Sequence, residues 1–125
     1  MLPLRPDPKS IVLCADDYAL NESVSQGIVD LASRQRLSAT SVMTLSPLWP
    51  QHAPALRELR GAIDVGLHLD WTSEFAQHAG WGQTLGAVMW RSFTGGFKPE
   101  RVREALERQF DAFENAWQEI GRAHV

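Results

Sequence analysis

The stretch "SIVLCADDYALNESV", Ser10–Val24, places a short apolar run directly before two adjacent carboxylates, Asp16 and Asp17. The apolar run predicts a strand over Ile11–Ala15 that is buried on both faces, with Cys14 as one of its small buried residues. Two neighbouring carboxylates repel each other, so the pair needs either solvent or a nearby cation. Taken alone, a solvated acidic turn and a cation site explain the pair equally well.

The segments after this stretch alternate between helix and strand patterns. A helix capped by Asn21 is predicted first, followed by a strand over Ser38–Leu45. A second helix is predicted within Gln51–Arg60, with Pro54 in its first turn, and a strand follows over Ala62–Leu69. A long loop over Asp70–Phe97 then leads to an amphipathic helix from Pro99. This order is typical of right-handed βαβ units around a parallel sheet, and the predicted class is therefore α/β.

Composition limits the remaining function classes. The chain has 125 residues, of which 44% are hydrophobic and 22% charged, as expected for one globular domain. Residues 1–9 contain three prolines and read as a leader, and residues 10–125 read as the domain. A net charge of -3 argues against nucleic-acid partners, and no apolar stretch is long enough to predict a membrane span. A single cysteine favours a reducing, cytoplasmic location.

The predicted topology brings three chemically active side chains to one edge of the sheet. Asp16 and Asp17 follow the first strand, and His68 lies at the end of the third. Sites in parallel α/β folds form at the carboxyl ends of strands. Carboxylate oxygens and an imidazole nitrogen suit a divalent metal ion, which would also relieve the repulsion within the acidic pair. The alternative for His68 is a hydrogen-bonded core histidine.

Three ordered motifs carry a resemblance to a known family. The stretches "IVLCADDYALNESVSQGI", "LSATSVMTLSP" and "IDVGLHLDWT" resemble the YdjC-like carbohydrate deacetylases, and "LERQFDAFENA" is similar to a glutamine-containing helix of that family. The resemblance implies a (β/α) barrel-like fold, a divalent metal ion such as Mg²⁺ or Zn²⁺, and hydrolytic removal of an acetyl group from an N-acetylated sugar.

The resemblance also implies roles for single residues. Asp17 and His68 match metal ligands, and Asp16 matches the neighbouring general base, which would take a proton from a metal-activated water. Within the same motifs, we expect Tyr18, Trp71 and Thr72 to contact the substrate. Ala19 departs from the family's usual glycine, and this change bears on the turn because glycine adopts a positive φ readily and alanine does not.

Members of this family are about twice as long as this chain, which therefore resembles only the first half of the barrel. The third metal ligand is then either absent or supplied by His124, and the chain alone is expected to have little activity. Uncovered strand edges and apolar faces favour association, including homo-oligomers. Two other hypotheses stay open, namely a non-catalytic α/β binding or scaffold domain, and a flavodoxin-like fold in which the acidic pair and His68 diverge.

Overall fold

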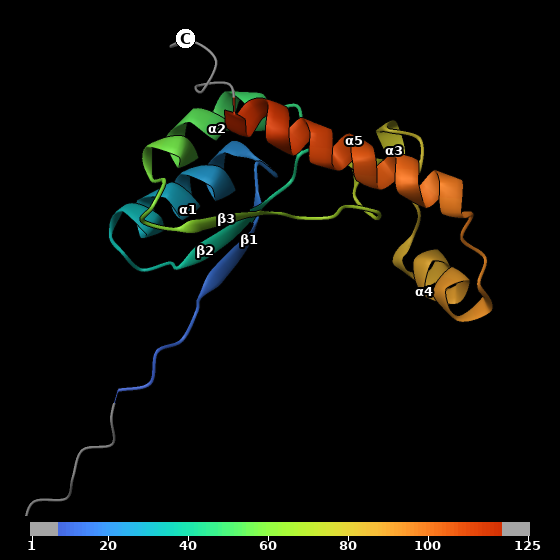
Figure 1. Ribbon diagram of the computed structural model, residues 1–125, viewed down its shortest axis with the longest axis horizontal. Helices are drawn as coiled ribbons and strands as arrows, with labels where there is room; N and C mark the ends of the chain where they lie inside the picture. Colours follow the sequence, from blue (N-terminus) through green and yellow to red (C-terminus); the bar gives the residue numbers. More distant parts are fainter. Residues whose placement is uncertain (1–7, 119–125) are drawn as a thin grey trace, which may run out of the picture.

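Three parallel strands alternate with helices along residues 8–118, which are the residues that the computed structural model describes. The strands are β1 (Cys14–Tyr18), β2 (Ala39–Val42) and β3 (Asp64–Leu67). The helices are α1 (Glu22–Ser33), α2 (Trp49–Glu58), α3 (Glu74–His78), α4 (Leu85–Thr94) and α5 (Pro99–Gln118). Figure 1 shows α5 running from α2 across to α3, with α4 set apart from the sheet.

The strands form one sheet in the order β1-β2-β3, and both pairings are parallel. A consecutive parallel order, with helices between the strands, is the arrangement of part of a (β/α) barrel. A flavodoxin-like sheet would instead place its first strand between the second and third. The predicted α/β class and barrel-like topology are therefore confirmed, and the flavodoxin-like hypothesis is wrong.

The first strand lies three residues later than its apolar run predicts. The side chains of Ile11 and Val12 are 80% and 77% exposed, and Cys14 is exposed rather than buried. The partner strand explains the shift, because the first paired residue of β2, Ala39, lies opposite Cys14 and leaves the earlier residues without a partner strand. The acidic pair is consequently part of β1 and does not follow it.

A β-bulge in β1 changes the direction of the acidic side chains. Ala15 pairs with Thr40 and Tyr18 with Val42, so β1 uses one residue more than β2 over the same distance. The extra residue is accommodated by a left-handed backbone at Asp17, where φ is +67°. Aspartate tolerates this conformation better than most residues.

The turn after β1 contains the alanine at which the family pattern has glycine. Ala19 is fully buried with φ at +72°, a conformation that costs a non-glycine residue about 1–2 kcal/mol. Its N–H donates to the Ser25 hydroxyl at 3.0 Å, and the Asn21 side chain caps α1 by accepting from the Val24 N–H. Helix α1 therefore begins at the predicted cap, and hydrogen bonds hold the strained turn in place.

The hydrophobic core lies between the sheet, α1, α2 and α5. Trp49, the first residue of α2, is 1% exposed and stacks on Phe113 of α5 with ring centroids 6.0 Å apart. Helix α2 starts two residues before the predicted Gln51, so Pro50 occupies its first turn and Pro54 lies inside the helix. The prediction for Pro54 was wrong because Pro50, four residues earlier, suits the first helical turn equally well.

The segment Asp70–Phe97, predicted as a long loop, contains two helices. The hydroxyls of Ser73 and Thr84 cap α3 and α4, and α4 ends at Gly95 with φ at +67°. Helix α3 has only five residues, and α4 contributes no buried residue. Helix α3 is too short to show a helical period, whereas α4 carries apolar residues at helical spacing (Leu85, Val88 and Met89) that the loop prediction overlooked and that stay largely unburied. Among residues 8–118, no helix is long and apolar enough to cross a membrane.

One buried glutamine of α5 fixes the chain just after β3. The Gln109 side chain is fully buried, and its Oε1 accepts from the Asp70 N–H at 2.7 Å. Its Nε2 donates to the carbonyls of Asp70 and Ala105, each at 3.2 Å. Both backbone polar groups of Asp70 are thus satisfied by one side chain.

We predict that Gln109→Leu lowers the free energy of unfolding by about 1–3 kcal/mol, because the buried Asp70 N–H loses its partner while the Asp70 carbonyl keeps only the bond from Trp81 Nε1. Urea denaturation followed by circular dichroism measures the change. Gln118→Leu makes the same substitution at an exposed position of the same helix and is the matched control. Equal stability of the two variants would contradict the assigned role of Gln109.

Candidate functional site

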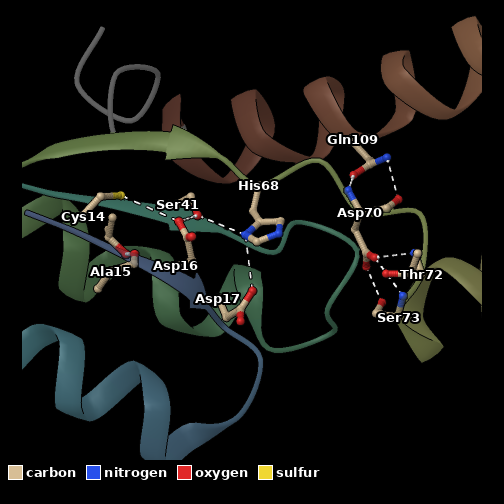
Figure 2. Close-up of polar contacts among 11 residues, drawn as sticks. Cys14, Ala15, Asp16, Asp17, Ser41, His68, Asp70, Thr72, Ser73 and Gln109 are labelled. Carbon is tan, nitrogen blue, oxygen red and sulfur yellow. Dashed lines mark hydrogen bonds and ion pairs between the residues drawn. The ribbon is translucent and has the colours of Figure 1, made fainter. Parts of the chain in front are cut away.

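Four polar side chains meet at the end of the sheet toward which the strands run (Figure 2). Asp16 and Asp17 come from the bulge in β1, Ser41 from β2, and His68 from the residue directly after β3. The Ser41 hydroxyl lies between the others, donating to Asp16 Oδ1 at 2.7 Å and lying 3.1 Å from His68 Nδ1. The convergence predicted from strand order is therefore present.

The imidazole of His68 contacts two of these groups through one nitrogen. Its Nδ1 is 3.3 Å from Asp17 Oδ1 in addition to its contact with Ser41. The single hydroxyl proton of Ser41 is directed to Asp16, so its oxygen accepts from His68. This arrangement corresponds to a ring that carries a proton on Nδ1, between Ser41 and Asp17.

Asp16 is exposed and is oriented through one oxygen. Its Oδ1 accepts from Ser41 and, at 3.7 Å, from the Cys14 thiol, which leaves Oδ2 free of hydrogen bonds within the described part of the chain. Partial desolvation of the thiol, followed by the charge and the hydrogen bond of Asp16, raises the pKa of Cys14 although the residue as a whole is exposed. A raised pKa disfavours the thiolate, so Cys14 is not an activated nucleophile.

The donor atoms of Asp17 and His68 fit one divalent metal ion. Ligand bonds of about 2.0–2.2 Å to carboxylate oxygen and imidazole nitrogen place two ligands of a tetrahedral ion about 3.4 Å apart, and the two atoms here are 3.3 Å apart. Within residues 8–118, no group of three or more histidine, cysteine or acidic side chains is arranged to hold a metal ion. His124, the candidate third ligand, lies outside the described residues.

Sequence reasoning missed Ser41 and gave Asp70 no role. Asp70 is 4% exposed, and its carboxylate accepts from the N–H groups of Thr72 and Ser73 and from the Ser73 hydroxyl. This carboxylate therefore fixes the turn before α3 and orients the capping residue Ser73, and it is not directed to the acidic pair (Figure 2). The run "DWTS" was a detectable turn signal. Ser41 gave only the weak signal of a polar residue inside a strand.

The two substrate candidates of the third motif lie after the site. Trp71 is half-buried with its ring edge toward Phe97, and it lines a cavity of about 670 Å³. Thr72 is exposed, and its N–H donates to the Asp70 carboxylate. A substrate contact of either residue stays a prediction.

The structure does not support a substrate contact for Tyr18. Its side chain is 1% exposed and packs edge-on against Trp49. The phenol hydroxyl donates to the carbonyl of His52 in α2 at 2.7 Å. Tyr18 follows the bulge and is directed into the helical layer, so its role is in packing.

A model of the family described as YdjC-like protein matches residues 10–121. The chain belongs to the YdjC-like family. This membership confirms the resemblance that the three sequence motifs carry.

This YdjC-like chain is similar to a known protein in sequence and to a solved structure in fold. It is 27% identical to a chitooligosaccharide deacetylase from Serratia marcescens over 84% of its own length. Its fold is similar, with a TM-score of 0.57 and 19% identity over 89% of the chain, to a crystal structure from Enterococcus faecalis provisionally described as a cellobiose-phosphate cleavage protein. The latter likeness concerns the fold alone. The chain spans 44% of the length of each relative.

Burial raises the pKa of Tyr18 to about 12, from an ordinary value near 10. We therefore predict that the folded protein loses stability as the pH rises from about 10 to about 12, because the unfolded chain releases this proton first. Tyr18 is the single tyrosine, so ultraviolet absorbance of tyrosinate reports on it alone.

In denaturant the same residue should titrate near its ordinary value, and Tyr18→Phe should remove this part of the alkaline loss of stability. A folded-state titration midpoint near 10 would contradict the burial of the phenol.

Proposed function

We propose that this YdjC-like chain is part of a metal-dependent hydrolase that removes the acetyl group from an N-acetylated sugar. The observation that carries the proposal is the 3.3 Å approach of Asp17 Oδ1 to His68 Nδ1, beside a second carboxylate that is oriented separately. Family membership and the described activity of the Serratia relative support the same chemistry.

Asp17 and His68 would hold the metal ion. A divalent ion held there would supply Lewis-acid chemistry, polarising the acetyl carbonyl and making a bound water more acidic. A metal ligand needs a free lone pair, so binding through Nδ1 would require the imidazole to carry its proton on Nε2 instead of directing it at Asp17.

Asp16 acts as the general base. Its Oδ2 is free to take a proton from the attacking water, while the hydrogen bond from Ser41 to Oδ1 holds the carboxylate in one orientation. The water oxygen bonds to the acetyl carbon and the bond from that carbon to nitrogen breaks. The proton held by Asp16 passes to the departing nitrogen, and the products are acetate and the free amino sugar.

A non-catalytic binding or scaffold domain is the second candidate. One observation favours it, namely that no third ligand accompanies Asp17 and His68 within residues 8–118. Two protein ligands leave most of the coordination to water, which exchanges readily. Metal affinity separates the two candidates, because only a deacetylase retains the ion.

We predict that Asp17→Ala and His68→Ala each weaken metal binding more than about 100-fold. Loss of a residue that only hydrogen-bonds to a metal ligand costs roughly 10–100-fold, and loss of a ligand itself should cost more. The measurement is isothermal titration with Mg²⁺, Mn²⁺ and Zn²⁺ on a protein that spans the length of its relatives, with bound metal counted by elemental analysis. Asp64→Ala is the matched control, because Asp64 is an exposed carboxylate at the opposite end of β3. Equal retention by all three variants would refute the site.

We predict that Asp16→Asn retains the metal but loses turnover by roughly 10²–10⁴-fold, because the amide can accept the Ser41 hydrogen bond but cannot take the proton of the water. Acetate release from a chitooligosaccharide measures the rate. Loss of metal by Asp16→Asn, together with its retention by Asp17→Ala, would reverse the two roles.

A further inference from the structure

A half-open cavity lies beyond the candidate metal site. It measures about 670 Å³ and is bordered by the segment after β3, by α4 and by the start of α5. Its aromatic lining residues are Trp71, Trp81, Trp90 and Phe97. We propose that this cavity is a saccharide subsite, which binds sugar rings of an oligosaccharide beyond the one that carries the reacting acetyl group. The inference rests on the proposed function and adds the chain length of the substrate to it.

The indole rings of the cavity have the chemistry that a sugar ring requires. The axial hydrogens of a pyranose form a flat apolar face, which stacks on an aromatic ring. Trp81 is held by hydrogen bonding of its Nε1 to the Asp70 carbonyl at 3.3 Å and by Arg108, which lies 5.0 Å from its ring centroid. Trp90 is 70% exposed, so its ring is available as a platform.

The polar groups of the cavity complement hydroxyl groups, which both donate and accept hydrogen bonds. Arg91, Lys98 and Arg101 line it as donors, and no carboxylate is among the lining residues. Gln83 also lines the cavity, and its buried Oε1 lacks a hydrogen-bond partner within the described part of the chain. A buried acceptor without a partner is costly, and a ligand hydroxyl would satisfy it.

The position of the cavity allows one ligand to reach both places. Trp71 is three residues after His68, so their Cα atoms are at most about 11 Å apart. Gln109 and the Asp70 backbone fix the segment that joins them. Sugar rings in the cavity would therefore position a connected ring at the acidic pair.

Isothermal titration with N-acetylchitotetraose, in the presence of a chelator, tests the subsite on Trp90. We expect Trp90→Ala to bind the tetrasaccharide roughly fivefold to tenfold more weakly, the loss expected for one aromatic stacking contact, and Trp90→Phe to retain most of the affinity. Phe93→Ala is the matched control, because Phe93 is an 84% exposed aromatic residue of the same helix that does not line the cavity. Its affinity should equal that of the unaltered protein.

No tetrasaccharide binding by the unaltered protein, or unchanged affinity in Trp90→Ala, would overturn the subsite. Equal losses in Trp90→Ala and Phe93→Ala would also overturn it, because they would indicate a general apolar patch on α4. The titration needs neither metal nor turnover. A negative result here beside metal-dependent acetate release therefore refutes the subsite alone, whereas binding without metal retention refutes the proposed hydrolase alone.

Discussion

The extra residue in β1 is the constraint on which the candidate site depends. Adjacent side chains of a regular strand point to opposite faces of the sheet, so Asp16 and Asp17 would be separated by the sheet itself. The left-handed backbone at Asp17 breaks this alternation and brings one carboxylate to Ser41 and the other to His68. The geometry of the site therefore requires the energetically unfavourable left-handed backbone at Asp17. Aspartate adopts this conformation more readily than most non-glycine residues.

Helix α5 supports this geometry from a distance. Gln109 holds the backbone of Asp70, two residues after His68, while the carbonyl of Ala112 one turn further accepts from the Trp49 indole in α2. The strand end that carries the imidazole and the helical layer that covers the sheet are thus attached to the same helix. A displacement of α5 would therefore move His68 relative to the acidic pair.

The sequence was most informative where a pattern has one physical meaning. Strand order, the Asn21 cap and the meeting of Asp17 with His68 follow from alternation and from the rule that parallel strands end at one edge. The start of β1 was misplaced because apolar runs report hydrophobicity, whereas a strand needs a partner, and β2 begins opposite Cys14. Burial of Tyr18 depends on the bulge, which is a property of the pairing between two distant segments and leaves no local signal.

Helix α4 is exposed, so its sequence is free to vary. It contributes no buried residue, and glycines in left-handed conformations, Gly80 and Gly95, lie in the segments on either side of it. Substitutions along its surface consequently carry little folding penalty, unlike those in α5. Selection can alter the cavity wall that α4 provides while the bulge, the strand ends and the core stay constant. If the cavity binds sugar as proposed, substitutions in α4 would change ligand preference with little effect on stability, whereas α5 carries buried core residues.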